Sequence, residues 1–158
     1  MPRNPALIGV LSDTHGLLRD EAFRALAGSE LIIHAGDVGR PEILERLQTM
    51  APVVAVKGNI DTGAWASGLP ARAVVEAGPA RIYVLHDLHE LDVNPASAGF
   101  HVVISGHSHK PCRTDRDGVI YLNPGSAGPR RFRLPVTVAR MDLAQSPWKI
   151  ELVNLEIA

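Results

Sequence analysis

Polar clusters at five places in the sequence carry side chains of types that bind metal ions. The clusters are Asp13-Thr14-His15, Gly36-Asp37, Gly58-Asn59, His86 and Gly106-His107-Ser108-His109, which together supply four imidazoles, two carboxylates and one carboxamide. A single cluster of this kind has ordinary explanations, because Asp caps turns and Gly-Asp or Gly-Asn are common turn dipeptides. Five such clusters, each at the end of an apolar run, instead indicate a metal-assisted hydrolase.

Each cluster follows an apolar run that predicts a buried strand. The predicted strands are Leu7–Leu11, Leu31–His34, Val53–Val56, Arg81–Leu85 and Val102–Ile104. In open α/β folds, ligands bind beyond the carboxyl ends of such strands. If the five strands share one sheet, we expect the seven donor side chains to meet at one edge.

The donor types narrow the choice of ion. Cys112 is the only cysteine, so the thiolate sets of structural zinc sites are absent. The mixture of nitrogen and oxygen donors also differs from the all-oxygen cages of calcium and magnesium. Manganese, iron, cobalt, nickel and zinc all suit the set, with manganese our first expectation. Seven donors exceed what one ion with an open position needs, so we expect two ions, with Asp37 as the carboxylate that bridges them.

Two divalent cations and two carboxylates leave the site net positive, which favours an anionic substrate. Paired ions about 3.5–4 Å apart turn water into a hydroxide nucleophile and clamp the oxygens of an in-line displacement. Phosphate esters fit this chemistry best.

The ordered pattern D-x-H, GD, GN-x-D, H and GHSH resembles the calcineurin-like metallophosphoesterase superfamily. The chain length and the Asn123–Ser126 segment are similar to its small bacterial and archaeal phosphodiesterase branch, and the resemblance extends over residues 8–133. It implies that Gly36 and Gly58 let the backbone pass close to the metals. The implied ligands are, for the first metal, Asp13, His15 and His109, for the second, Asn59, His86 and His107, and for the bridge between them, Asp37.

The sequence departs from the family pattern at two places. The family's second-metal histidine usually precedes glycine, whereas this chain reads His86-Asp87-Leu88-His89. We expect His86 to be the ligand because it follows the apolar strand directly, and His89 to contact substrate or to transfer a proton. Larger members carry a histidine acid directly after the Gly-Asn pair, where this chain has Ile60 and Asp61. Asp61 is therefore a candidate catalytic acid, with capping of the turn as the alternative.

Charge and composition exclude other classes of protein. The chain has 158 residues and a formal net charge of −1, and its basic and acidic residues are mixed along the sequence. This pattern does not indicate a general surface for binding nucleic acid. The local exception is Pro129–Pro135, whose three arginines could contact a phosphate or a partner chain; the alternative is a solvated edge with Phe132 packed beneath. No signal peptide or membrane-spanning stretch is evident and the single cysteine suits a reducing compartment, so we expect a cytoplasmic protein without a membrane partner.

The elements that must position the clusters alternate between strand and helix at first and are then strands alone. Asp20 is expected to cap a helix over Glu21–Ala27, and Pro41 to open one over Glu42–Thr49. The later runs predict strands over Ala73–Glu76, Val119–Leu122, Val136–Met141 and Trp148–Leu155. In the family's terms the fold class is α/β, a four-layer α/β/β/α sandwich of two mixed sheets with flanking helices, in one domain over 1–158.

The sequence therefore predicts a two-metal-dependent phosphoesterase that hydrolyses phosphodiesters through a metal-bound hydroxide. The lack of a histidine acid after Asn59 favours good leaving groups and ranks diesters above monoesters. A phosphomonoesterase and a non-catalytic scaffold or sensor on the same fold are the alternatives, although the chain keeps all seven donors. The expected partner is a small phosphorylated substrate, and the sequence leaves a homo-oligomer open.

Overall fold

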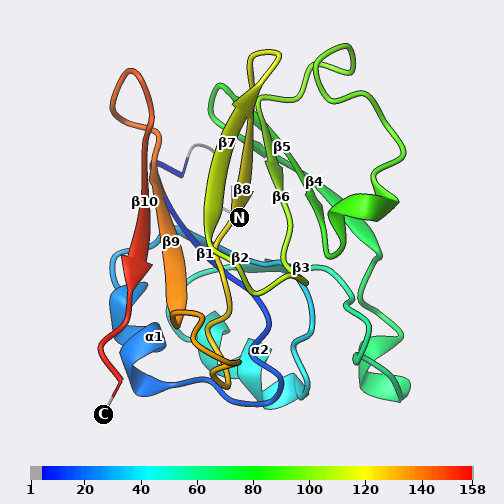
Figure 1. Ribbon diagram of the computed structural model, residues 1–158, viewed down its shortest axis with the longest axis vertical. Coiled ribbons are helices and arrows are strands. Elements are labelled where there is room, and N and C mark those ends of the chain that lie inside the picture. Colours follow the sequence, from blue (N-terminus) through cyan, green and yellow to red (C-terminus); the bar gives the residue numbers. More distant parts are fainter. Residues whose placement is uncertain (1–4, 158) are drawn as a thin grey trace.

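The computed structural model describes residues 5–157 and consists of two five-stranded β-sheets that pack face to face (Figure 1). The first sheet has the order β10-β9-β1-β2-β3. Its strands are β1 (Leu7–Leu11), β2 (Leu31–His34), β3 (Val53–Ala55), β9 (Thr137–Asp142) and β10 (Lys149–Asn154). The second sheet has the order β4-β5-β6-β8-β7. Its strands are β4 (Arg72–Ala77), β5 (Ala80–Leu85), β6 (Val102–Ile104), β7 (Cys112–Arg116) and β8 (Val119–Asn123).

Alternation along β1 assigns its side chains to two different cores, because successive residues of a strand point to opposite faces. Ile8 and Val10 belong to the cluster between the sheets, together with Ile82 and Ile104 of the second sheet. Leu11 belongs to the cluster under the helices. The first sheet is therefore covered on both faces, and its ends are held rigidly.

Both α-helices cover the outer face of the first sheet (Figure 1). Helix α2 (Pro41–Gln48) begins at a proline, as predicted, and buries Ile43 and Leu47. The prediction that Asp20 caps the first helix was wrong. Helix α1 (Asp20–Ala25) starts at Asp20 itself, and its N-cap residue makes no side-chain bond. The carboxylate of Asp20 instead accepts a hydrogen bond from Arg46 at 2.8 Å, which ties the two helices together.

The outer face of the second sheet carries no α-helix among the described residues. The segment 86–101 covers it, with a single 3₁₀ turn, η2 (Leu88–Glu90), and with Phe100 packed against Tyr83. A second 3₁₀ turn, η1 (Ala64–Ala66), follows β3. The two mixed sheets confirm the predicted fold class, but irregular chain makes up most of its fourth layer.

The five strands that precede the polar clusters do not share one sheet, which corrects the simplest expectation. β1, β2 and β3 run parallel in the first sheet, and β5 and β6 run parallel in the second. The packed sheets nevertheless bring all five carboxyl ends together. The functional loops therefore meet between two sheets rather than along one edge.

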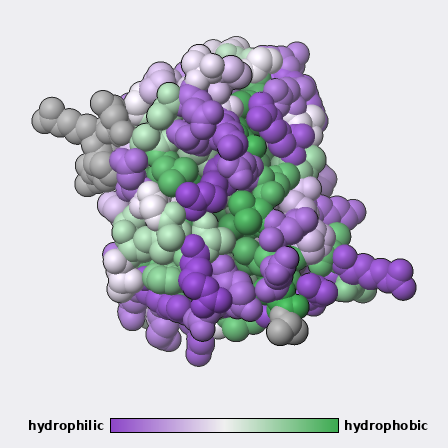
Figure 2. Space-filling view, turned by 90° about the vertical axis from the view of Figure 1, so that its left-hand side faces the viewer, coloured by the Kyte–Doolittle hydropathy of each residue, from purple (hydrophilic) through white to green (hydrophobic). Residues whose placement is uncertain are grey.

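Figure 2 shows the molecule from the side of β10, where hydrophilic side chains surround an apolar strip. β10 is an edge strand, and Leu152 on it is 38% exposed. No helix within residues 5–157 is long and apolar enough to cross a membrane.

Candidate metal centre

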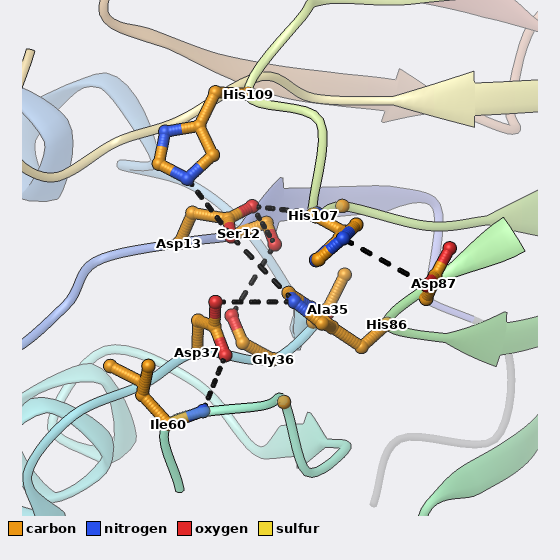
Figure 3. Close-up of polar contacts among 12 residues, drawn as sticks. Ser12, Asp13, Ala35, Gly36, Asp37, Ile60, His86, Asp87, His107 and His109 are labelled. Atoms are coloured by element: carbon orange, nitrogen blue, oxygen red, sulfur yellow. Dashed lines mark hydrogen bonds and ion pairs between the residues drawn. The ribbon is translucent and has the colours of Figure 1, made fainter. Parts of the chain in front are cut away.

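Six of the seven predicted donors lie in two tight groups at the junction of the sheets. The ligand atoms within each group are all within 4.8 Å of one another. The first group is Asp13, His15 and His109, and the second is Asp37, His86 and His107. The side chains reach this junction from the ends of β1, β2, β5 and β6, as Figure 3 shows for most of them. The first group holds the three predicted ligands of the first ion, and the second group holds Asp37, the predicted bridge, with two predicted ligands of the second ion.

Asn59, the seventh predicted donor, follows β3 and is exposed. It lies with His86 on the wall of a hollow of about 210 Å³, whose other lining residues include Lys57 and Glu90. Asn59 thus lines the same hollow as His86, a member of the second group.

Each carboxylate is fixed by one oxygen and presents the other to the imidazoles. Oδ2 of Asp13 accepts hydrogen bonds from the Ser12 hydroxyl at 2.7 Å and from the His107 backbone N–H at 3.1 Å. Oδ1 of Asp37 accepts one from the Ile60 backbone N–H at 3.1 Å. The loops themselves therefore hold the free oxygens in position, as a preorganised metal site requires.

The free oxygen of Asp37 lies between the two groups. Oδ2 is 3.4 Å from Nε2 of His15, in the first group, and 3.2 Å from Nε2 of His86, in the second. The free Oδ1 of Asp13 is closest to Nε2 of His109, at 3.4 Å, and is 3.8 Å from Nε2 of His86. Asp37 is thus within 3.4 Å of an imidazole of each group, whereas Asp13 approaches the second group only to 3.8 Å.

The ring of His86 is oriented by the strand next to it. Its Nδ1–H donates to the Ala35 carbonyl at 2.7 Å, which leaves Nε2 without a proton in the neutral ring and turned toward both aspartates (Figure 3). A backbone carbonyl on the distal nitrogen is a common way to hold a metal-binding histidine. Gly36 lets the ring approach, because a Cβ at that position would lie 2.6 Å from Nδ1 of His86.

Buried polar atoms without partners show that the residues fit a metal ion. Within residues 5–157, the buried side-chain atoms without a hydrogen bond are Asp13 Oδ1, His15 Nε2, Arg72 Nε, His86 Nε2 and His109 Nδ1. Three of them, on Asp13, His15 and His86, face one another across the centre. Leaving such groups unpaired costs about 1–3 kcal/mol each, and one or two cations among them would satisfy these atoms together.

The charges of the centre keep the carboxylate of Asp37 ionised. Burial would raise its pKa, but the close contact with His86 and the Ile60 N–H outweigh burial and hold the pKa at about 2. For His86, burial would lower the pKa, whereas Asp37, the Ala35 carbonyl and Asp13 outweigh it and raise the pKa. Burial lowers the pKa of His109, and the positive charge of Arg131 adds to that effect.

The donor residues adopt an unusual backbone conformation. Seven described non-glycine residues have positive φ, and five of them belong to the two groups of donors. They are Asp13 (58°), His15 (48°), Asp37 (55°), His107 (71°) and His109 (63°). Such conformations cluster at functional sites because the surrounding structure has to hold them there.

Gly58 allows the loop after β3 to lie directly against Asp37. A Cβ at this position would collide with the backbone nitrogen and the Oδ1 of Asp37. The family resemblance implied that the backbone passes close to the metals at Gly58, and the lack of space for a Cβ beside Asp37 explains why glycine is needed there.

Asp61 is buried and holds two loops together, and its side chain does not face an open site. It is 3% exposed, and its oxygens accept three backbone hydrogen bonds, from Gly39 and Gly58 at 2.9 Å and from Val38 at 3.2 Å. These bonds join the loop after β2, which carries Asp37, to the loop after β3. They favour the turn-capping interpretation of Asp61 over an acid role.

His89 lies outside both groups of donors. Its side chain is 95% exposed, and its Nδ1 is 3.1 Å from Oδ1 of Asp87. The other oxygen of Asp87 is 3.8 Å from Nε2 of His107. His89, Asp87 and His107 also line a hollow of about 340 Å³ that continues over Tyr121. His89 is thus placed at the rim of the centre, where it could meet a substrate.

His34 is a supporting residue that the sequence pattern did not reveal, because it is the last residue of a strand. It is fully buried, and burial lowers its pKa to about 4. Its Nδ1 accepts from Gly36 N–H at 3.1 Å, so its Nε2–H donates to the Thr14 hydroxyl at 3.0 Å, which donates to the Val38 carbonyl. One imidazole therefore joins the loop of Asp13 to the loop of Asp37. A histidine inside an apolar strand was the only available signal.

The Asn123–Ser126 segment supports the loops that carry the donors. Asn123 donates from Nδ2 to the Gly106 carbonyl at 3.0 Å, and the Ser126 hydroxyl donates to the Asp13 carbonyl at 3.1 Å. The alternative interpretation of the basic segment Pro129–Pro135 was wrong in one respect. Phe132 is not packed beneath the arginines but is 93% exposed.

Comparisons with known proteins agree with this geometry. The family model of the calcineurin-like phosphoesterase superfamily domain matches residues 7–146. A probable metallophosphoesterase of Methanothermobacter thermautotrophicus is 36% identical over 149 residues, which cover 86% of this chain and 86% of the relative. A phosphodiesterase of Methanocaldococcus jannaschii is 27% identical over 137 residues, which cover 75% of this chain and 82% of the relative.

Solved structures extend the likeness to the whole fold. A predicted phosphoesterase from Streptococcus pneumoniae matches with a TM-score of 0.72 and 26% identity, over 98% of this chain and 93% of that chain. Vacuolar protein sorting 29 from Chaetomium thermophilum matches with a TM-score of 0.75 and 20% identity, over 95% of this chain and 99% of that one. The latter likeness shows the fold alone.

Proposed function

Because this chain belongs to the calcineurin-like phosphoesterase superfamily, we propose that it is a phosphodiesterase that works with two divalent metal ions. The observation that carries the proposal is the pair of donor groups around unpartnered buried atoms. The relative named as a phosphodiesterase supports the choice of ester.

The proposed ligands follow the two groups. Asp13, His15 and His109 hold the first ion, and His86, His107 and Asn59 hold the second. Asp37 bridges them, which agrees with its contacts of 3.4 and 3.2 Å to the imidazoles of His15 and His86. Mixed imidazole, carboxylate and carboxamide donors suit manganese, our first choice of ion, and the neighbouring transition metals.

Bound ions would supply Lewis-acid stabilisation of the phosphoryl oxygens and a lowered pKa for an attacking water. The chain's own residues supply orientation. Ser12 and the Ile60 N–H fix the carboxylates, and His34 and Asp61 hold the loops that carry them. The reacting groups thus meet a centre that needs little rearrangement.

The surroundings of the centre favour a diester. Two hollows adjoin it, one of about 340 Å³ next to His107 and one of about 210 Å³ next to His86. A diester has a substituent on each side of the phosphorus, whereas a monoester has one. Space next to the centre is therefore available for two substituents, as a diester requires.

His89 is the proposed proton donor to the leaving oxygen. It is exposed at the rim of the hollow that His107 also lines, and Asp87 holds its Nδ1, which leaves Nε2 free to reach a substrate. General acids of this kind contribute about 10²–10⁴-fold when the leaving group is poor. The single cysteine suits a reducing compartment, so we place this activity in the cytoplasm.

The test is turnover by chelator-stripped protein reloaded with one metal at a time. We expect Mn to restore hydrolysis, with bis(4-nitrophenyl) phosphate cleaved faster than 4-nitrophenyl phosphate and two ions per chain by elemental analysis. Asp37→Asn should abolish activity, and His101→Ala, a histidine outside the centre, should not.

Full activity with one ion per chain would overturn the two-metal assignment, and faster monoester cleavage would overturn the diester assignment. A protein that binds two ions and cleaves no ester would instead fit the non-catalytic alternative.

A further inference from the structure

A third hollow, of about 650 Å³, lies beside the proposed centre and has no role in the function described so far. Its lining residues are Ser108, Lys110, Arg131, Phe132, Arg133 and Leu134. Ser108 and Lys110 flank His109 in the chain, and Arg131 is close enough to His109 to affect its pKa. The hollow is thus within reach of a substrate held at the centre.

The loop that forms the far wall is anchored at both ends. The Gly128 carbonyl accepts from Nε of Arg19 at 3.1 Å, and Val136 forms a bridge with Ser126. A turn at the tip is closed by a hydrogen bond from Leu134 N–H to the Arg131 carbonyl at 3.0 Å. The loop therefore presents residues 131–134 from a fixed base.

Phe132 is the most exposed of the large apolar side chains in the described part of the protein. It is 93% exposed and has a φ of 51°, a conformation that bulky residues rarely adopt. The next most exposed, Val74, reaches 52%. An aromatic ring held out in water buries no apolar area on folding, and its flat face is free to stack on an external partner.

The cationic side chains that line the same hollow have no protein partner in the described part of the chain. Within residues 5–157, no hydrogen bond or ion pair joins the side chains of Lys110, Arg131 or Arg133 to another residue. Arg46 and Arg113, in contrast, each contact a carboxylate. The cations around the hollow are therefore available to an anion.

We propose that this hollow binds a nucleotide unit of the diester substrate, with the base stacked on Phe132 and a phosphate held by Arg131, Arg133 and Lys110. A base offers a flat aromatic face and its phosphate offers charge, and these are the two features that the hollow can recognise. The overall net charge of −1 favours a small diester over a long nucleic acid. The proposal rests on the proposed function, because it assigns one arm of that substrate.

Three esters with the same leaving group test the proposal on the metal-loaded protein. Methyl 4-nitrophenyl phosphate has no arm, the 4-nitrophenyl ester of thymidine 5′-phosphate adds a base, and its 3′-phosphorylated derivative adds a phosphate. We expect kcat/KM to rise along this series. Phe132→Ala should remove the gain from the base, which is about 5–150-fold for a stacked base, mainly through KM. Arg133→Ala should remove the gain from the added phosphate.

The methyl ester serves as the internal control. Neither variant should change its turnover, since both side chains are exposed and outside the donor groups, and Arg24→Ala should change none of the three reactions. Equal rates for the three esters, or equal losses on all of them, would overturn the nucleotide assignment and leave the proposed function standing.

A protein that cleaves none of the esters would contradict the proposed function, and the hollow is then tested by binding alone. Calorimetry with thymidine 3′,5′-bisphosphate should show about tenfold weaker binding to Phe132→Ala than to the unchanged protein. Equal binding would overturn the assignment of the hollow.

Discussion

Replacing Asp61 by asparagine separates a bracing carboxylate from a catalytic acid. The side chain is buried, and its two oxygens accept three backbone hydrogen bonds from two loops. Asparagine keeps one acceptor and puts an NH₂ where the second oxygen was. Depending on its orientation, the amide leaves either Gly39 N–H alone or both Val38 and Gly58 N–H facing another donor.

The loss of stability follows from these contacts. A hydrogen bond to a charged group contributes about 1.5–3 kcal/mol, and a neutral one about 0.5–1.5 kcal/mol. At least one bond is lost and the others lose their charge assistance, so we expect Asp61→Asn to lower the free energy of unfolding by about 3 kcal/mol. Asp20→Asn is the matched control, because that carboxylate is exposed and, within residues 5–157, is joined only to Arg46, and pairs of this kind contribute about 0–1 kcal/mol.

Urea unfolding and kinetics with two substrates provide the readout. If Asp61 braces the loops, kcat/KM should fall by the same factor for bis(4-nitrophenyl) phosphate and for a diester with an alkoxide leaving group. A general acid would instead give a loss of about 10²–10⁴-fold confined to the poor leaving group. Unchanged stability together with that selective loss would refute the bracing role.

Two further predictions concern histidines. His86→Ala should lose one of two bound ions by elemental analysis, whereas His89→Ala should keep both and be slower only on poor leaving groups; retention of both ions by His86→Ala would remove it from the ligand set. Burial lowers the pKa of His34 from 6.5 to about 4, so the unfolded chain takes up a proton as the pH falls below 6.5 while the folded chain does not until about pH 4. The stability that the neutral ring gives is complete above pH 6.5 and is lost by about 1.4 kcal/mol per pH unit below it. The unfolding free energy of the unchanged protein should therefore decrease by about 3 kcal/mol more than that of His34→Asn between pH 6.5 and 4, and parallel pH profiles would contradict this.

The strands and the donor positions could be predicted because both depend on local patterns. β1 and β2 have the predicted bounds, since a short apolar run that ends in a polar cluster is typical of a buried strand. Residue types and the family resemblance also predicted two sets of ligands, and six of the seven predicted ligand residues lie in two groups. His86 joins its group and His89 does not, because a residue at a strand end inherits the direction of the strand.

The features that the sequence did not reveal depend on contacts between distant segments. β7 has five exposed residues without apolar alternation, so only its pairing with β8 makes it a strand. Asp20 does not act as a helix cap because Arg46, 26 residues away, takes its carboxylate. The brace formed by His34 and Thr14 likewise joins loops that are adjacent only after the sheet has formed.

The positive φ angles explain why aspartate and histidine suit this centre beyond their donor atoms. A left-handed conformation costs an ordinary residue roughly 1–2 kcal/mol, and Asp, Asn and His adopt it several-fold more often than other non-glycine residues. Two backbone hydrogen bonds between the loops after β1 and β2 compensate part of that cost. The Asp13 N–H donates to the Gly36 carbonyl at 2.9 Å, and the His15 N–H donates to the Asp37 carbonyl at 2.9 Å. The same two residue types thus allow the sharp backbone turns and supply the ligand atoms. A change to a β-branched residue at Asp13 or His15 should therefore disturb the loop itself as well as remove a donor.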